Sequence, residues 1–356
     1  MTADLLAAAD AHGRVVASTF RPHPLLAHAH LQTIAPTFLR PLPALTLRVE
    51  RLETPDGDFV DVGWVGERHA GAPIATLVHG LGGGFESKYL RGLAGRLEAL
   101  GWRVALLQLR GGGAEPNRLA RSYHHGDTRD LRWLWRQLRQ REPSTPIAAV
   151  GWSLGGNLLL RALYEEGAES PVRQAVAASV PFSLRDCAEH MQRGFARVYQ
   201  RHLLAGLRAI VRRKHATYPL PDAIDVAAAL AATSFVDFDA AFTAPLNGFE
   251  DALDYYERTS CGAILGRIST PTLIVQAQDD PFMPAGMMPG ADRLAPAVTL
   301  EVARAGGHVG FIGRGARGGL DWWLERHIAG HLQRALGRDD TALDDVGAAA
   351  LSAEAV

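Results

Sequence analysis

Hydrophobic and polar residues alternate in two short runs over residues 45–65. The runs are separated by Pro55-Asp56-Gly57, which carries the residue types of a tight turn. Alternation with a period of two is typical of a strand with one buried face. This stretch therefore predicts an antiparallel hairpin.

Beyond the hairpin, continuous apolar runs of strand length alternate with stretches of helical length. The predicted strands are 73–80, 103–110, 146–152, 172–180, 270–278 and 298–306, and the predicted helices are 87–101, 127–140, 154–167 and 319–336. Strands separated by helices of this length indicate βαβ units. We therefore expect an α/β protein in which helices flank a mostly parallel central sheet.

Residues 181–268 break this rhythm with a largely helical pattern. We predict a core in two parts, 45–180 and 269–338, with a helical cap insertion at 181–268 between them. We also predict an N-terminal extension at residues 1–44 and a flexible tail at the acidic, Ala-rich residues 339–356. Open parallel sheets bind ligands at the carboxyl ends of their strands, so the cap should lie over that edge.

A small polar residue, Ser153, stands between glycines where a predicted strand meets a predicted helix, in GWSLGG. Gly-x-Ser-x-Gly in this context is the nucleophile-elbow pattern, a turn so tight that bulky neighbours two positions away are excluded. The alternative is a glycine-rich turn in which Ser153 caps the helix. The flanking strand and helix favour the nucleophile.

A serine nucleophile needs a base, and the base needs a carboxylate to orient it. In this architecture the chain order is Ser, acid, His. The acid is expected after the strand at 270–278, where Asp279 and Asp280 both stand; we favour Asp280 and leave Asp279 as the alternative. His308 follows the next strand in a Gly-Gly-His loop and is the predicted base.

The loop after the first parallel strand, LVHGLGGGFES, is where an oxyanion hole is expected. The backbone amides of Leu81 and Leu154 are the candidate donors, and His79 is expected to be structural. His327 and His331 lie inside the closing helix, where solvated or packed side chains are the simpler interpretation.

Several segments are far more specific than the serine turn, and they extend from HLQT at 30–33 to GGHVGF at 306–311. They include HGLGGGFESKYL, LRGGGAEPN, SYHHGDTRDL, GWSLGGNLLLRAL, APLNGFEDALDYYERTS and QAQDDPFMP. With these segments the chain resembles the YheT-like hydrolases of the α/β-hydrolase superfamily, which are related to the ABHD1/ABHD2/ABHD3-type proteins.

This resemblance implies a serine hydrolase of carboxylic esters with Ser153, Asp280 and His308 as its triad and no cofactor or metal. Gly112 stands where the family often has a cysteine, a departure beside the expected pocket. An acyltransferase or thioesterase using the same triad is the alternative enzyme. A non-catalytic ligand-binding module on the same fold is the alternative of another class.

Arg110 and His124 lie in a polar, glycine-rich loop that should border the site, so they are candidate substrate-pocket residues. A hydrogen-bonded loop scaffold is the favoured alternative. The pairs His28/His30 and His124/His125 suggest a metal, but no carboxylate or cysteine completes a site at ligand spacing, so we expect none.

Residues 193–214 carry six arginines and Lys214 without an acidic residue. Leu203, Leu204, Leu207, Ile210 and Val211 form a possible apolar face. Such a helix can contact an anionic membrane, although the solvated outer face of a cap helix is favoured.

The whole chain of 356 residues has a formal net charge of −1, with 47% hydrophobic and 21% charged residues. These values predict a globular protein with no general attraction to nucleic acid. The chain shows no basic leader, no apolar run of membrane-spanning length and only two cysteines. We expect a cytoplasmic protein that acts on a small-molecule ester.

Overall fold

The computed structural model of the chain describes residues 12–69, 71–316 and 318–338. The predicted tail at 339–356 lies outside the described residues. Nine strands form one sheet in the order β1-β9-β8-β7-β6-β4-β5-β3-β2. They are β1 (Arg14–Ala17), β2 (Arg48–Glu53), β3 (Phe59–Val65), β4 (Ile74–Val78), β5 (Arg103–Leu107), β6 (Ile147–Trp152), β7 (Val172–Ala178), β8 (Thr272–Ala277) and β9 (Val298–Ala303).

Pairing within the sheet follows the expected pattern. The β2–β3 hairpin is antiparallel, β3 also pairs antiparallel with β5, and every other neighbouring pair is parallel. The expected α/β class with a mostly parallel sheet is confirmed. β1 was not predicted, because its four residues are all exposed and show no alternation. It adds to the edge of the sheet by pairing with β9.

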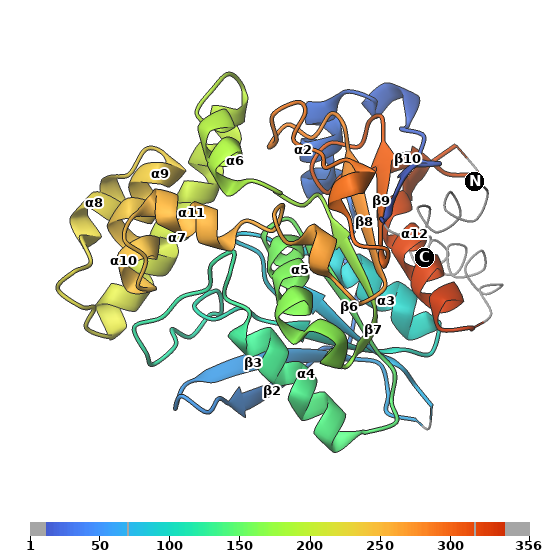
Figure 1. Cartoon of the computed structure of the whole chain (residues 1–356), viewed down its shortest axis with the longest axis horizontal. Helices are drawn as coiled ribbons and strands as arrows, with labels where there is room; N and C mark the ends of the chain where they lie inside the picture. The colour runs from blue at the N-terminus through green and yellow to red at the C-terminus, as the bar shows by residue number, and fades with distance from the viewer. Residues whose placement is uncertain (1–11, 70, 317, 339–356) are drawn as a thin grey trace, which may run out of the picture.

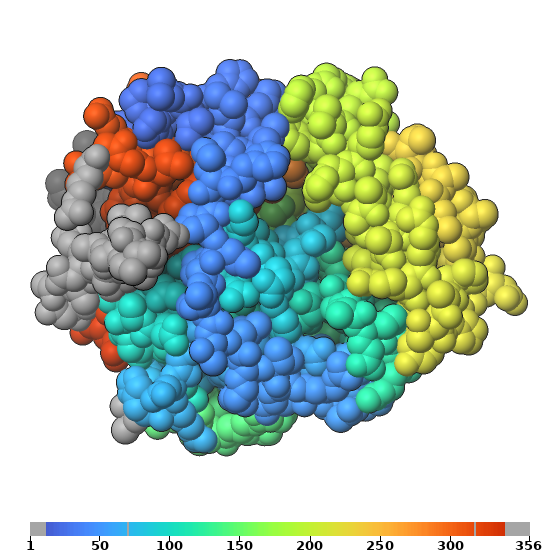
Figure 2. Space-filling view, turned by 180° about the vertical axis from the view of Figure 1, so that it is seen from behind, coloured from blue at the N-terminus to red at the C-terminus, as the bar shows by residue number. Residues whose placement is uncertain are grey.

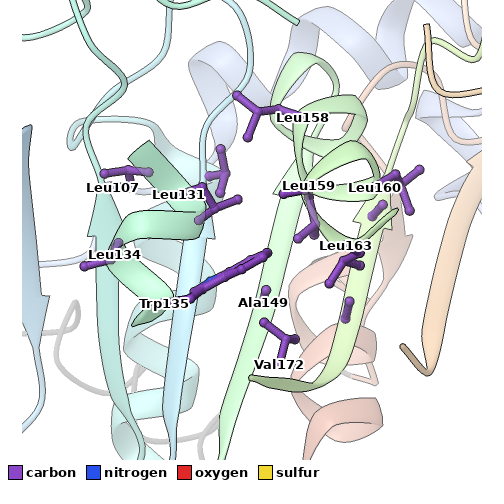
Figure 3. Close-up of a cluster of buried hydrophobic side chains, with 14 of the residues drawn as sticks. Leu107, Leu131, Leu134, Trp135, Ala149, Leu158, Leu159, Leu160, Leu163 and Val172 are labelled. Carbon is purple, nitrogen blue, oxygen red and sulfur yellow. The ribbon is translucent and has the colours of Figure 1, made fainter. Parts of the chain in front are cut away.

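Four helices cover the two faces of the sheet (Figure 1). They are α3 (Lys88–Ala99), α4 (Arg129–Arg141), α5 (Leu154–Glu166) and α12 (Trp323–Ala335). Side chains of α4 and α5 pack in one buried cluster and those of α3 and α12 in another. Figure 3 shows the first cluster, with Leu131, Trp135 and Leu159 lying over the strands. Each buried leucine contributes about 1.5–3 kcal/mol, so this packing holds the strand ends in place.

Between β7 and β8 the chain forms helices only, and these lie together at one end of the molecule (Figure 1). They are α6 (Leu184–His190), α7 (Ala196–Thr217), α8 (Val226–Ala231), α9 (Phe235–Phe238), a π-helix (Asp239–Thr243), α10 (Ala244–Leu246) and α11 (Ala252–Thr259). Several of them share a small apolar cluster that includes Leu204, Val211 and Phe238. The apolar face expected on the basic helix therefore points partly into this cluster.

Two smaller features complete the described structure. Helix α2 (Ala29–Leu39) lies in the N-terminal segment, and β10 (Ile312–Arg314) pairs with β11 (Leu320–Trp322) just before α12. Both cysteines are free. None of the described helices combines the length and apolarity required to span a membrane.

Candidate active site

Ser153 occupies the junction between β6 and α5 with φ 53° and ψ −119°. A positive φ is unfavourable for a residue with a Cβ and points to a site where local strain is maintained. The flanking positions can hold only glycine, because there is no room for a side chain. A Cβ at Gly151 would lie 2.3 Å from the Gly155 carbonyl oxygen, and a Cβ at Gly155 would lie 2.4 Å from the Val78 carbonyl oxygen.

Ser153 is hydrogen-bonded to His308, and His308 to Asp280. The distance from Ser153 Oγ to His308 Nε2 is 2.9 Å, and His308 Nδ1 lies 2.9 Å from Asp280 Oδ2. Because the carboxylate accepts, Nδ1 carries the proton and Nε2 is left to accept from the serine hydroxyl. The three side chains come from the ends of β6, β8 and β9, as the sequence led us to expect.

The two neighbouring aspartates have different partners. Asp280 is 4% exposed, and its second oxygen accepts the Phe282 amide at 2.9 Å. Asp279 instead accepts the Gly307 amide at 2.9 Å, and burial raises the pKa of its carboxyl. Asp279 therefore supports the loop that carries His308, whereas Asp280 contacts the imidazole.

The imidazole of His308 is fixed from two sides. The ring of Phe282 stacks on it at a centroid distance of 3.9 Å, and the His308 amide donates to Thr33 Oγ1 at 3.0 Å. Thr33 belongs to α2, far away in sequence. Neither contact was predicted, although Thr33 lies in the HLQT segment.

Gln32 binds the same loop more extensively. Its buried amide donates to the carbonyls of Leu26 and Ile312, at 2.8 and 3.0 Å, and accepts the Ile312 amide at 2.7 Å. The Gln32 carbonyl oxygen would lie only 2.0 Å from a Cβ at Gly310, so only glycine fits there. Helix α2 thus anchors the His308 loop, a role that no local sequence pattern indicated.

The loop expected to supply the oxyanion hole passes close to the serine, since a Cβ at Gly80 would lie 3.3 Å from the Ser153 Cβ. Tyrosine hydroxyls hold it, because the Gly80 amide donates to Tyr89 and the Gly82 amide to Tyr123, both at 2.9 Å. Leu81 and Leu154 both line the cavity that contains Ser153.

Behind this loop, His79 is fully buried, and burial lowers its pKa to about 4. Its Nδ1 donates to the Gly80 carbonyl at 2.7 Å, and its Nε2 accepts the Leu109 amide at 3.1 Å. A neutral imidazole in these contacts connects the loop to the chain after β5. His79 is thus a structural residue.

Ser153 and His308 face a cavity of about 680 Å³. Most of its lining is apolar and comes from α2, from the serine elbow and from the helices between β7 and β8. Apolar side chains in the lining include Ile34, Phe38, Leu184, Met191, Val198, Leu203, Leu207, Phe235 and Phe282. Leu203 and Leu207 belong to the predicted apolar face of the basic helix, and they point into this cavity.

Arg110 does not line the cavity, and its assignment as a substrate-pocket residue is corrected. The guanidinium is buried among three aspartates that hold the loop after β5. Its ion-pair distances are 3.0 Å to Asp56, 3.1 Å to Asp58 and 2.7 Å to Asp130. These carboxylates come from two distant segments, so the local sequence pattern could not reveal them.

His124 does line the cavity. Burial lowers its pKa to about 4, so the ring is neutral near pH 7, and its Nδ1 accepts the Gly126 amide at 3.1 Å. Of the histidines considered for a metal, His30 contacts the Tyr199 hydroxyl and His125 the Tyr255 hydroxyl. Among the described residues no cluster of three or more His, Cys, Asp or Glu side chains is arranged to hold a metal ion.

One acidic group in the cavity wall was not predicted. Asp239, in the π-helix, accepts a hydrogen bond from the Tyr256 hydroxyl at 2.7 Å. It forms no ion pair within the described part of the chain, and burial raises its pKa to about 6. A lone aspartate in a helical stretch carries no motif, so the sequence offered no signal for it.

Replacing Asp239 with Asn is expected to stabilise the protein above pH 6, because the amide keeps the Tyr256 contact and removes a buried charge. The folded-state pKa of about 6 exceeds the ordinary aspartate value of 3.8, so ionisation disfavours folding as the pH rises between these values. The gain should reach up to about 3 kcal/mol above pH 6 and vanish near pH 4. Denaturant unfolding at several pH values measures it.

The exposed Asp222 provides the matched control. Asp222→Asn should leave the pH dependence of stability unchanged. A difference between Asp239→Asn and the unsubstituted protein that does not vary from pH 4 to pH 8 would contradict the buried-charge account.

Comparison with known proteins gives a consistent assignment. Residues 76–314 match the family model described as alpha/beta hydrolase fold. The chain is 42% identical over 322 residues to the Escherichia coli (strain K12) protein named "Putative esterase YheT", covering 90% of this chain and 94% of that protein. It is 28% identical over 310 residues to "Phospholipase ABHD3" of Mus musculus, covering 85% and 75% of the two chains.

Among solved structures, the Pyrococcus furiosus esterase Pf2001 superposes with a TM-score of 0.53 at 16% identity. The match covers 82% of this chain and 93% of that one, and it shows that the fold is shared. Together with the family match and the relative at 42% identity, this establishes that the chain belongs to the α/β-hydrolase superfamily, in the family that includes YheT.

Proposed function

We propose that this protein is a serine esterase that cleaves carboxylic esters through Ser153, His308 and Asp280. The single observation that carries the proposal is the pair of 2.9 Å hydrogen bonds that connects hydroxyl, imidazole and carboxylate at the wall of an apolar cavity. The names of its relatives, an esterase and a phospholipase, favour the same reaction class.

In the first half-reaction, His308 Nε2 takes the hydroxyl proton as Ser153 Oγ attacks the ester carbonyl carbon. The negative charge on the carbonyl oxygen is stabilised by the Leu81 and Leu154 amides, each typically contributing about 3–4 kcal/mol in the transition state. Asp280 stabilises the imidazolium. His308 then returns the proton to the leaving alkoxide oxygen, which departs as the alcohol and leaves an acyl-enzyme.

In the second half-reaction, His308 takes a proton from water as the water oxygen attacks the acyl carbon. The tetrahedral intermediate breaks its bond to Ser153 Oγ, and His308 returns the proton to that oxygen. The carboxylic acid is released and the resting hydrogen bonds form again. No step requires a metal or a cofactor.

We further propose that residues 181–268 act as a cap that shapes the substrate pocket. Apolar lining favours a short- to medium-chain acyl group or a lipid-like ester. Localisation in the cytoplasm belongs to the same proposal and is supported by the two free cysteines.

A panel of p-nitrophenyl esters tests this proposal. Burying each methylene contributes up to about 0.8 kcal/mol, so kcat/KM is expected to rise at least about tenfold from acetate to octanoate. Equal rates across the panel would contradict an apolar acyl site, and product analysis with added alcohol or thiol would separate hydrolysis from acyl transfer.

A further inference from the structure

The mouth of the cavity lies between two segments that are far apart in sequence. Phe38 from α2 and Val198 from α7 line the cavity that contains Ser153, yet their side chains are 77% and 51% exposed. Side chains that line a cavity and face solvent mark its opening. Figure 2 shows a hollow between the blue N-terminal segment and the yellow-green helices α6 and α7.

Exposed apolar side chains concentrate on the two chain segments that contribute to this mouth. Seven of the thirteen exposed large hydrophobic residues in the described chain fall within 25–42 and 195–198. They are Leu25, Leu31, Phe38, Leu39, Leu42, Phe195 and Val198, and we call them the apolar rim. Scattered apolar residues are ordinary on a protein surface, but a group at the entrance of a cavity indicates a contact surface.

Both segments that carry the apolar rim are basic. Residues 12–49 contain four arginines and residues 190–221 contain six arginines and Lys214, with no Asp or Glu in either range. The net charge of the whole chain is only −1, so positive charge is concentrated on these two segments.

The basic residues of α7 and its approach differ in their contacts. Arg208 and Lys214 donate to backbone carbonyls, whereas the exposed arginines 193, 197, 201, 212 and 213 form no ion pair with a described residue. At the far end of the helix, Lys214 donates to the carbonyls of Asn117 and Leu119 and is held within the protein. Beside the apolar rim, Arg193, Arg197 and Arg201 are exposed and make no ion pair with any described residue. Charges without an internal partner are the ones available to an anionic surface.

We propose that the apolar rim and these three arginines dock the protein peripherally on an anionic phospholipid bilayer, with the cavity mouth against the lipid. Exposed aromatic and aliphatic side chains insert at the acyl boundary while arginines contact lipid phosphates. This inference rests on the proposed function, because its consequence is that a lipid-like ester enters the cavity directly from the membrane.

Sedimentation with vesicles tests the docking surface independently of catalysis. In low salt, the full-length protein is expected to bind vesicles of equal phosphatidylglycerol and phosphatidylcholine, and to bind pure phosphatidylcholine at least about tenfold more weakly. Arg197→Glu combined with Arg201→Glu should weaken binding to anionic vesicles at least about tenfold, since each basic residue contributes about fivefold. Salt at 0.5 M should reduce binding by screening.

The same helix offers a matched control. Arg212 and Arg213 are exposed and about 23 Å from Arg197 along the helix axis, at 1.5 Å per residue. Arg212→Glu combined with Arg213→Glu reverses the same charge away from the mouth and should retain most of the binding. For the apolar rim, Phe38→Ser is expected to weaken binding, whereas Leu253→Ser, at another exposed apolar position, should not.

Failure of docking and failure of the proposed function are distinguishable. Ser153→Ala should bind vesicles as the unsubstituted protein does, and Arg197→Glu with Arg201→Glu should hydrolyse a soluble ester at the normal rate. The docking proposal is overturned by absent binding to anionic vesicles at low salt, or by equal losses in the two charge-reversal pairs. Vesicle binding by a protein with no esterase activity would instead overturn the proposed function alone.

Discussion

Ser153→Ala is expected to lower kcat for p-nitrophenyl octanoate by at least about 10⁴-fold, because the proposed nucleophile is removed. The hydroxyl lies 2.9 Å from the imidazole, and no other hydroxyl in the described part of the chain is hydrogen-bonded to that ring. The same substitution should abolish covalent labelling by a fluorophosphonate probe, which reacts with activated serines.

Stability should change little in this variant, since the strained backbone at residue 153 is retained and one hydroxyl is lost. Ser269→Ala, at an exposed serine just before β8, is the control and should label normally. Unchanged labelling in Ser153→Ala would show that another residue is the nucleophile.

Asp280→Asn is expected to lower kcat by about 10⁴-fold, whereas Asp279→Asn should lower it by less than about tenfold. An amide at residue 280 can donate to His308 Nδ1 and so favours the tautomer that carries its proton on Nε2. A protonated Nε2 cannot accept the hydroxyl proton of Ser153. An amide at residue 279 still offers an oxygen to the Gly307 amide. Steady-state kinetics at pH 8 measures both variants.

These neighbouring residues form a matched pair, because they share the loop, the substitution and the change in size. Circular dichroism of both variants should match that of the unsubstituted protein. Equal losses of activity in the two variants would indicate that the loop as a whole matters and that Asp280 has no separate role.

The sequence could predict that Ser153, Asp280 and His308 meet, because their positions follow from topology. Carboxyl ends of parallel strands meet at one edge of a sheet, so residues that follow β6, β8 and β9 converge whatever the helices between them do. The spacing of Gly151 and Gly155 added a steric requirement that the structure explains, since a Cβ at either glycine would collide with a backbone carbonyl. The sequence alone could not decide whether Asp279 or Asp280 contacts His308, because the side chains of neighbouring loop residues can point in different directions. The structure shows the contact at Asp280.

Contacts between distant segments could not be predicted from the sequence. The three aspartates around Arg110 come from the hairpin turn and from α4, and no local pattern joins them. Asp239 is one acid in a helical stretch, and its raised pKa arises from burial by neighbours that fold over it. β1 is too short and too exposed to produce an alternation that differs from a loop.

The anchoring of the His308 loop by α2 has a consequence for the order in which the protein matures. During synthesis the serine turn and its sheet neighbours emerge well before residue 308. Gln32 and Thr33 are made earlier still, but their partners Ile312 and His308 lie 280 and 275 positions further along the chain. Closing so long a loop is slow, and domains with such pairings assemble late. In a nascent chain, Ser153 is therefore present before His308 is held in place. We expect the site to form only after α2 has packed against the His308 loop.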